Sequence, residues 1–448
     1  MRRVMQWMGG LVSLLLVVVI GLFTVSRLME PSDAQRAALA LLEADDPKPV
    51  GRNAFGALWL IEYDVPPEEI EAVVAADMEN YRKALTDAAS SQVLSNQASV
   101  AEGRFSRHRG EPSDLRSCGT NDASCLAKVR ERRDEYARQI ARDRVLVERI
   151  RGLAAFGHYR NLLDSHIFPP LPPFQRLFAS HTASALDFIE GRTDDALKTV
   201  CTDVETWRRI GANGDNLIFA MIGGAMVDTG ARLFADMLAE LPLDHPLPPI
   251  CASAFDPAHV APDLCSAMRG EERIARSHMD RFGDEAYPFL RTLLLDVEAT
   301  RAIMAPVYAQ ACAEEARRAL IDDTPIAYPA VSLSPWQLRC ASNYLGCSVM
   351  LIAAPLYTPY LHRAQDEQAM IRLVDTLLHL RQQAAASGQA MTQVLNADGL
   401  RPPVVTWRRP VFDETAGEVG IPLRGRGSVD EWRIPLPASR SDGAQTAQ

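Results

Sequence analysis

An uncharged apolar stretch near the start of the chain constrains its possible folds more than any other feature. Met1-Arg2-Arg3 precedes Val4 to Val25, and this stretch holds no charged residue. A helix rises about 1.5 Å per residue, so twenty residues cover roughly 30 Å, the hydrocarbon thickness of a bilayer. Trp7 at the near end of the stretch suits an interfacial anchor. We therefore predict a transmembrane helix over residues 4–26, in contact with the lipid bilayer.

A cleaved signal peptide and a buried soluble helix are the competing interpretations of this stretch. The apolar region of a signal peptide is usually about 7–15 residues long, and Gly9 to Val25 is longer. Thr24-Val25-Ser26 is a poor small-x-small cleavage site, and the first cysteine, Cys118, is too distant for a lipoprotein site. We therefore expect an uncleaved signal-anchor.

The charges around the stretch set its expected orientation. Arg2-Arg3 precedes it, whereas Arg27 and Glu30 cancel each other just after it. The positive-inside rule then keeps residues 1–6 in the cytoplasm and exports the rest of the chain. Val349 to Tyr360 is also apolar, but it is short and contains two prolines, so we expect a single-pass protein.

The composition indicates a folded body after the anchor. Hydrophobic residues make up 47% of the chain and charged residues 23%, which excludes a mainly disordered protein. Acidic residues outnumber basic ones by 57 to 47, and the resulting net charge of −10 repels a phosphate backbone. We therefore expect no nucleic-acid partner.

Hydrophobic periodicity after the anchor predicts a mainly α fold. A juxtamembrane segment and linker over residues 27–52 lead into a helical exported domain over 53–400, with a stiff proline joint near 168–173. Helices are expected at about 64–90, 124–164, 174–190, 193–210, 214–240, 264–282, 286–320, 334–353 and 357–387.

Three helical patterns in this domain are more specific. Phe55, Trp59 and Tyr63 recur every four residues, so we expect them to share one face of a helix in the core. Arginines and acids alternate along 124–164, which is typical of a solvated helix face. Gly191 separates two helical runs and predicts an irregular helical hairpin, without the 34-residue recurrence of a repeat array.

The last part of the chain changes character. Val404-Val405-Thr406-Trp407, Val411-Phe412 and Val419 to Leu423 are short β-prone runs separated by turn residues. They predict a small β-hairpin within a β-rich segment over 401–438. Residues 439–448 are polar and are expected to be a disordered tail.

Eight cysteines, an even number, follow the anchor and predict disulfide bonds on the exported, oxidising side. No C-x-x-C spacing occurs, so thioredoxin-type chemistry and the common zinc ribbons have no support. Cys118 with Cys125 and Cys251 with Cys265 each flank turn residues, so we expect two local bridges there.

The other four cysteines allow alternatives. Cys340 and Cys347 lie in a predicted helix, where seven residues rise about 10.5 Å. The Cα atoms of a disulfide lie within about 7 Å, so this bridge is excluded unless the helix breaks, for instance at Gly346. Two pairings stay open. Cys201 would bond Cys340 and Cys312 would bond Cys347, or the two partners would be exchanged.

Several segments resemble a set of uncharacterised Gram-negative proteins. They run from Asn343-Tyr344-Leu345-Gly346 through Ile371-Arg372-Leu373-Val374 to Arg409-Pro410-Val411-Phe412-Asp413, and Asp203 to Arg209 is similar to the middle of those proteins. Tyr344 stands where the set has a proline. These proteins have an N-terminal membrane anchor and a long helical exported part, with no assigned activity. The resemblance implies an anchor in the inner membrane and a body in the periplasm.

The sequence holds no common catalytic or nucleotide-binding motif, such as G-x-S-x-G, H-E-x-x-H or G-x-x-x-x-G-K. The densest constellation is His158, Asp164 and His166. On a continuous helix the two histidines lie roughly 12 Å apart along the axis, too far to share a metal. No metal or cofactor is predicted, and catalytic residues are unknown.

Two classes of function stay open. The preferred one is a membrane-tethered scaffold or interaction protein that contacts another envelope protein. The alternative is an envelope enzyme whose site assembles from distant residues. A deep pocket joining several of the residues His158, His166, His181, Asp296 and Glu298 would favour the enzyme, whereas exposed aromatics on a shallow face would favour the scaffold.

Overall fold

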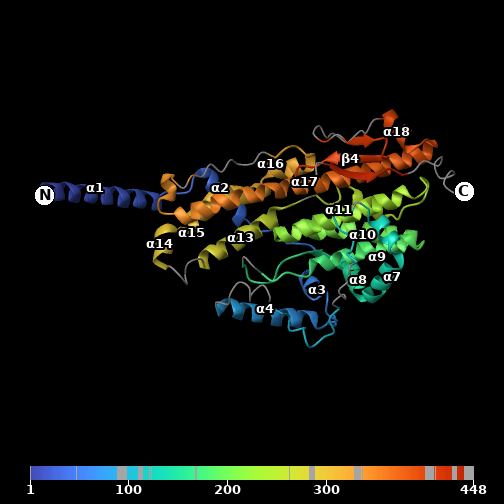
Figure 1. Cartoon of the computed structure of the whole chain (residues 1–448), viewed down its shortest axis with the longest axis horizontal. Helices are drawn as coiled ribbons and strands as arrows, with labels where there is room; N and C mark the ends of the chain where they lie inside the picture. Colours follow the sequence, from blue (N-terminus) through green and yellow to red (C-terminus); the bar gives the residue numbers. More distant parts are fainter. Residues whose placement is uncertain are drawn as a thin grey trace.

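The computed structural model describes residues 2–46, 48–87, 98–108, 115–120, 122, 124–166, 169–261, 263–281, 288–326, 334, 336–398, 408, 410–425 and 431–437, and most of them are helical (Figure 1). The helices are α1 Arg2–Arg27, α2 Asp33–Glu43, α3 Phe55–Trp59, α4 Ile70–Thr86, α6 Cys125–Glu131, α7 Arg133–Arg142, α8 Arg144–Arg151, α9 Ala179–Ile189, α10 Thr193–Ala212, α11 Leu217–Ala239, α12 Ile250–Phe255, α13 Cys265–Arg281, α14 Pro288–Leu294, α15 Val297–Ala309, α16 Glu314–Asp322, α17 Tyr344–Ser387 and α18 Met391–Asp398. Short 3-10 turns are η1 Gly152–Ala155, η2 Phe174–Phe178, η3 Gln310–Cys312 and η4 Leu338–Cys340, and the strands are β1 Arg52–Asn53, β2 Phe156–His158, β3 Val411–Asp413, β4 Glu418–Pro422 and β5 Glu431–Pro435.

Three described helices are long and apolar enough to cross a bilayer, judged by length and composition alone. In α1 the stretch Gln6–Arg27 projects from one end of the body (Figure 1), and 0% of its most apolar 18-residue segment is buried. In α11, 67% of the corresponding segment is buried, so its apolar residues belong to the core. In α17, 31% of the corresponding segment is buried, and this helix runs along the body from the end nearest α1.

Helices α9, α10 and α11 form the centre of the body. α9 and α10 make the predicted hairpin, and Gly191 between them has φ 86°, a left-handed conformation that glycine adopts without strain. α10 and α11 approach closely because glycines meet at their crossing. A Cβ added to Gly223 would lie 3.1 Å from the Cα of Gly211 and 3.3 Å from the Trp207 carbonyl oxygen.

The helix predicted over 124–164 is wrong in its length. The chain instead forms α6, α7 and α8, and after η1 it continues into β2. All three helices pack against α9, which has only 11 residues. A straight helix of forty residues would be about 60 Å long and could touch so short a partner over only part of its length. The bends let Val129, Tyr136 and Ile150 all reach the core.

The aromatic stripe also differs from its prediction. α3 ends at Trp59, so Tyr63 lies beyond the helix rather than on its face. Phe55 and Tyr63 are nevertheless buried, and Phe55 stacks on Trp59 with ring centroids 5.8 Å apart. The helix predicted from residue 64 is α4, which begins later, at Ile70.

Two further helix predictions differ from the structure in their boundaries. The run over 286–320 divides into α14, α15, η3 and α16, and α14 begins at Pro288. The pair predicted at 334–353 and 357–387 is a single helix, α17, which continues through Pro355 and Pro359. Those prolines free the carbonyl groups of Leu351 and Pro355, four residues earlier. Both residues are exposed, so water can satisfy the two carbonyls.

The small β region is present near the C-terminus and has three strands rather than a simple hairpin. β3, β4 and β5 are antiparallel in the order β3-β4-β5, with Phe412 opposite Val419 and Ile421 opposite Trp432. β5 is fixed to α11 because the Trp432 indole donates a hydrogen bond of 2.5 Å to Asp228. The predicted run at 404–407 and the tail at 439–448 lie outside the described residues.

All eight cysteines pair as disulfides. The predicted Cys118–Cys125 bridge is confirmed, with Cα atoms 5.5 Å apart. Cys340 and Cys347, whose bridge the prediction excluded, also pair, with Cα atoms 5.9 Å apart. The exclusion is wrong because α17 begins at Tyr344 and leaves Cys340 outside the helix, in η4.

The remaining bridges join distant segments. Cys251 bonds Cys201, and Cys265 bonds Cys312, with Cα separations of 4.9 and 4.5 Å. The predicted local bridge between Cys251 and Cys265 is therefore wrong, as are both pairings of Cys201 and Cys312 with the cysteines near α17. Packing explains the outcome, because α12 carries Cys251 onto α10 and α13 brings Cys265 against η3.

Candidate functional site

The constellation of His158, Asp164 and His166 does not lie on a helix. His158 lies in β2 and is buried, and the other two residues follow in a loop. The Asp164 carboxylate lies 3.4 Å from Nε of Arg82 on α4. Within the described part of the chain, no three His, Cys, Asp or Glu side chains could together hold a metal ion.

The other residues proposed for an enzyme site occupy separate helices. His181 is fully buried in α9, and burial alone lowers its pKa to about 4. Asp296 caps the N-terminus of α15 by accepting a hydrogen bond from the backbone N–H of Ala299. Glu298 is exposed in the first turn of α15, 3.2 Å from Arg276. The structure therefore does not bring these side chains into one pocket.

A pocket of about 360 Å³ lies between α7, α8, η2 and the segment before Cys125. Figure 1 places α7 and α8 at the end of the body opposite α1. Leu115, Leu146 and Phe178 contribute apolar surface to its lining. The charged and amide side chains of the lining include Arg116, Gln139, Arg142, Asp143 and Arg176.

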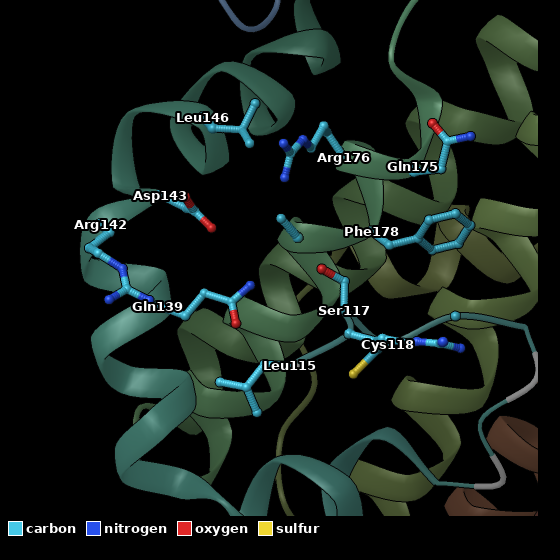
Figure 2. A pocket seen from close by; sticks show the side chains of 13 residues that line it. Leu115, Ser117, Cys118, Gln139, Arg142, Asp143, Leu146, Gln175, Arg176 and Phe178 are labelled. Carbon is cyan, nitrogen blue, oxygen red and sulfur yellow. The ribbon is translucent and has the colours of Figure 1, made fainter. Parts of the chain in front are cut away.

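Two arginines of the lining, Arg142 and Arg176, lie near the Asp143 carboxylate. Burial raises the pKa of Asp143, while the nearby Arg176 and Arg142 guanidinium groups act in the opposite direction. Figure 2 shows Asp143, Arg176 and Gln139 directed toward the same open space, with Arg142 at its edge. The buried Gln139 Oε1 accepts no hydrogen bond from the described residues. The excess of positive charge suits an anionic group such as a carboxylate or a phosphate.

Arg176 is held in place from outside the pocket. Its Nε donates a hydrogen bond of 3.0 Å to Glu62, a residue that follows α3 and is almost fully buried. Arg107 binds the other oxygen of the same carboxylate, with Nη2 2.8 Å away. This arrangement orients the Arg176 guanidinium before any ligand binds, which lowers the entropy lost on binding.

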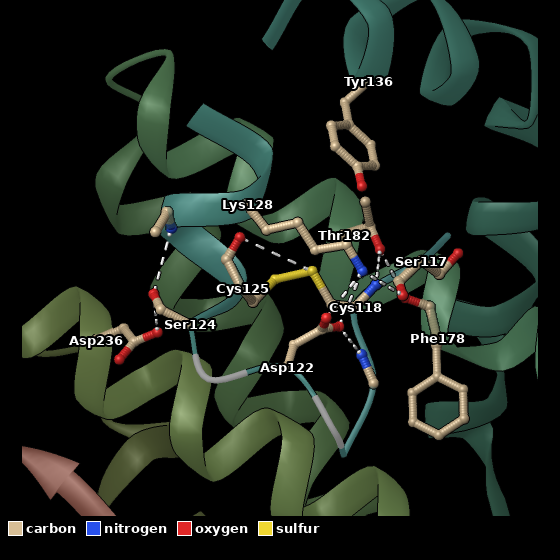
Figure 3. Close-up of a disulfide and its surroundings, with 12 residues drawn as sticks. Ser117, Cys118, Asp122, Ser124, Cys125, Lys128, Tyr136, Phe178, Thr182 and Asp236 are labelled. Atoms are coloured by element: carbon tan, nitrogen blue, oxygen red, sulfur yellow. Dashed lines mark hydrogen bonds and ion pairs between the residues drawn. A yellow bond between two sulfur atoms is a disulfide. The ribbon is translucent and has the colours of Figure 1, made fainter. Parts of the chain in front are cut away.

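The disulfide Cys118–Cys125 fixes one wall of the pocket (Figure 3). The backbone N–H of Cys118 donates to the Thr182 hydroxyl at 2.9 Å, which ties the segment to α9. The Tyr136 hydroxyl on α7 donates to the carbonyl of Arg116 at 3.0 Å. Cys118 itself is fully buried.

Lys128 on α6 adds a further restraint to the same wall. Its Nζ lies 3.0 Å from both carboxylate oxygens of Asp122 and 3.2 Å from the carbonyl of Ser117 (Figure 3). Asp122 in turn accepts a hydrogen bond from the N–H of Gly119 at 2.8 Å. The wall is therefore built before any ligand arrives.

No family model, curated protein or solved structure matches this chain. The nature of the ligand is therefore inferred from the pocket itself. Sequence reasoning missed this pocket because it assigned the arginines and acids of 124–164 to a solvated face. Its residues come from three separate segments with no shared motif, so only the folded arrangement shows that Asp143, Arg142 and Arg176 face one space.

Proposed function

We propose that the protein is a membrane-tethered interaction protein of the inner membrane, with its N-terminus in the cytoplasm and its helical body in the periplasm. We also group it with the membrane-anchored, helical exported Gram-negative proteins that its sequence resembles. Helix α1 is apolar and is not buried against the body, which supports a tether. Four disulfides support an oxidising compartment.

The cation-rich pocket at the end of the body opposite α1 is the observation that carries an interaction role. A tether at one end and a preformed pocket at the other suit the capture of a second envelope protein. Arg116, Arg142 and Arg176 favour an acidic side chain or a chain-terminal carboxylate of that partner. The apolar lining around them accommodates a neighbouring apolar side chain of the same partner.

The tether is tested with reporter fusions and N-terminal sequencing. A reporter that is active only outside the cytoplasm, fused after Gln448, should be active, and the protein should stay in the membrane fraction with Met1 or a nearby residue at its start. Activity from only a cytoplasmic reporter would contradict the orientation. A mature N-terminus near Arg27 would contradict the tether.

The pocket is tested by photocrosslinking in the native membrane. A photoreactive amino acid at Gln175, an exposed lining residue, should give a defined adduct with an acidic segment of an envelope protein. Arg142→Glu should reduce the adduct about tenfold, because one charge-assisted hydrogen bond contributes about 1.5 kcal/mol. The matched control is Arg144→Glu, an exposed residue two positions along that does not line the pocket. Equal yields from both variants would refute the role of the pocket.

A further inference from the structure

Exposed apolar side chains gather at the end of the body that α1 joins. We name this set the apolar collar, and its members are Leu28, Phe289, Trp336, Leu338 and Tyr344. Trp336 is 89% exposed and Phe289 is 74% exposed, although aromatic residues of this size are normally buried in a soluble body. The collar residues come from the residue after α1, from α14, from the segment around η4 and from the start of α17. Such a cluster indicates a surface that another apolar phase covers.

Direct contacts place the segments that carry the collar beside the end of α1. The Ser26 hydroxyl lies 2.9 Å from the Ser342 hydroxyl and accepts a hydrogen bond of 3.0 Å from the Ser342 N–H. Arg27 lies 3.4 Å from Asp296 and donates to the carbonyl of Leu295 at 3.5 Å. Ser342 is two residues from Tyr344, and Leu295 directly follows α14.

The length of α1 then fixes the depth of the collar, an argument that rests on the proposed function. Gln6–Arg27 has 22 residues, which cover about 33 Å and so end at the lipid headgroups. The buried Ser26 leaves no free linker between that end and the body. The collar therefore meets the bilayer at the level of the headgroups, where Trp and Tyr are enriched in membrane proteins.

The charges around the collar agree with a lipid surface. Residues 27–30, 288–296 and 336–344 contain three arginines (Arg27, Arg291 and Arg339) and two acids (Glu30 and Asp296). Three positive charges minus two negative charges give a local excess of one positive charge, in a protein whose net charge is −10. Anionic headgroups attract such a basic rim.

We infer that the apolar collar inserts into the headgroup region of the bilayer and forms a second membrane contact beside α1. The occupant is lipid rather than another protein because α1 itself brings a bilayer to this surface. The disulfide Cys340–Cys347 links the segment carrying Leu338 to the one carrying Tyr344, so both are presented from a braced loop. The body then stands on the membrane with α7 and α8, which line the cation-rich pocket, at the end far from α1 (Figure 1).

The experiment uses the full-length protein in phosphatidylcholine–phosphatidylglycerol vesicles that contain a lipid with a nitroxide in its headgroup region. Quenching of tryptophan fluorescence is compared between wild type, Trp336→Phe, Trp7→Phe and Trp59→Phe. Phenylalanine keeps most of the collar apolar, so the variants fold alike, which circular dichroism checks. Trp59 lies in α3, within the body, and serves as the control.

The collar predicts that Trp336→Phe loses a distinct part of the quenching and that Trp59→Phe loses none. Loss in Trp7→Phe with unchanged quenching in Trp336→Phe would overturn the collar and leave the tether standing. If another protein, rather than lipid, covers the collar in the cell, Trp336 is also unquenched in vesicles that contain lipid alone. Unchanged quenching in both Trp7→Phe and Trp336→Phe would overturn the tether as well.

A second variant tests the collar without fluorescence from Trp336. Phe289→Ser with Trp336→Ser should increase protease cleavage near residues 288 and 336 in vesicles and leave it unchanged in detergent micelles. The matched control is Val411→Ser, an exposed apolar residue on the terminal sheet. Equal cleavage of wild type and the double variant in vesicles would refute the contact.

Discussion

The Arg408 guanidinium lies 2.6 Å from the Asp366 carboxylate, and both side chains are almost fully buried. The same guanidinium lies 2.8 Å from Asp323, which also pairs with Arg424 at 2.8 Å. Asp323 ends α16 in a left-handed conformation, with φ 53°, and it also anchors this cluster. The cluster joins the terminal sheet to α17, and the backbone N–H of Gly425 completes it by donating to Asp366 at 2.7 Å.

Replacing Arg408 with methionine should lower the free energy of unfolding by about 3–5 kcal/mol, because the buried Asp366 loses its counter-charge and Asp323 keeps only that of Arg424. Urea unfolding of the purified protein measures the change. Arg144→Met is the control, since its ion pair with Glu148 is exposed and such pairs contribute little. Equal losses in both variants would contradict a structural role for the cluster.

Ser26→Ala should loosen the joint between α1 and the body. The change leaves the buried N–H and hydroxyl of Ser342 without the partner seen at 2.9–3.0 Å. An unsatisfied buried polar group costs about 1–3 kcal/mol. Thermal unfolding in detergent should show this loss, whereas Thr24→Ala, which removes an exposed hydrogen bond within α1, should not.

His181 should make stability depend on pH between about 6.5 and 4. Its folded-state pKa is lowered to about 4, so its contribution is present above the unfolded pKa and is lost as the pH falls through 4. The difference in pKa corresponds to about 3 kcal/mol. His181→Leu should therefore lose less stability than wild type between pH 7 and pH 4, measured by urea unfolding, while His379→Leu, exposed on α17, should follow wild type.

Asp203 acts in the opposite direction over part of this range. Burial raises its pKa to about 6, although the Ser180 hydroxyl donates to it at 2.6 Å. Its stabilising contribution is present below about pH 4 and is lost as the pH rises through 6. Comparing wild type with His181→Leu at each pH cancels this contribution. Parallel pH profiles for the two proteins would show that the imidazole is not buried in its neutral form.

Peptide mapping under non-reducing conditions should recover the four observed pairs. Removing the Cys201–Cys251 bridge, which spans 50 residues, should cost about 4 kcal/mol in the chain-entropy treatment. Removing Cys340–Cys347, which spans 7 residues, should cost about 2 kcal/mol. Variants in which both cysteines of one bridge are replaced with alanine, compared by urea unfolding, test that order. A peptide linked through Cys251 and Cys265 would contradict the observed fold.

The sequence by itself determined the features that depend on neighbouring residues. The uncharged run before Arg27 gives an apolar helix, periodic apolar residues give α10, α11 and α13, and β-prone runs give the terminal sheet. Cys118 and Cys125 were paired correctly because a short turn closes their loop. Helix and turn formation are governed by local hydrogen bonding and side-chain spacing, so a short window of sequence carries the signal.

Only the tertiary structure decided which distant segments meet. The helical run over 124–164 bends because its apolar residues must all reach the short α9, and nothing within that run states the length of α9. Cys251 bonds Cys201 because α12 packs on α10, and Arg176 reaches the pocket of Asp143 while being held by Glu62. These contacts follow from the burial of apolar surface over the whole body, a non-directional force that leaves no local pattern in the sequence.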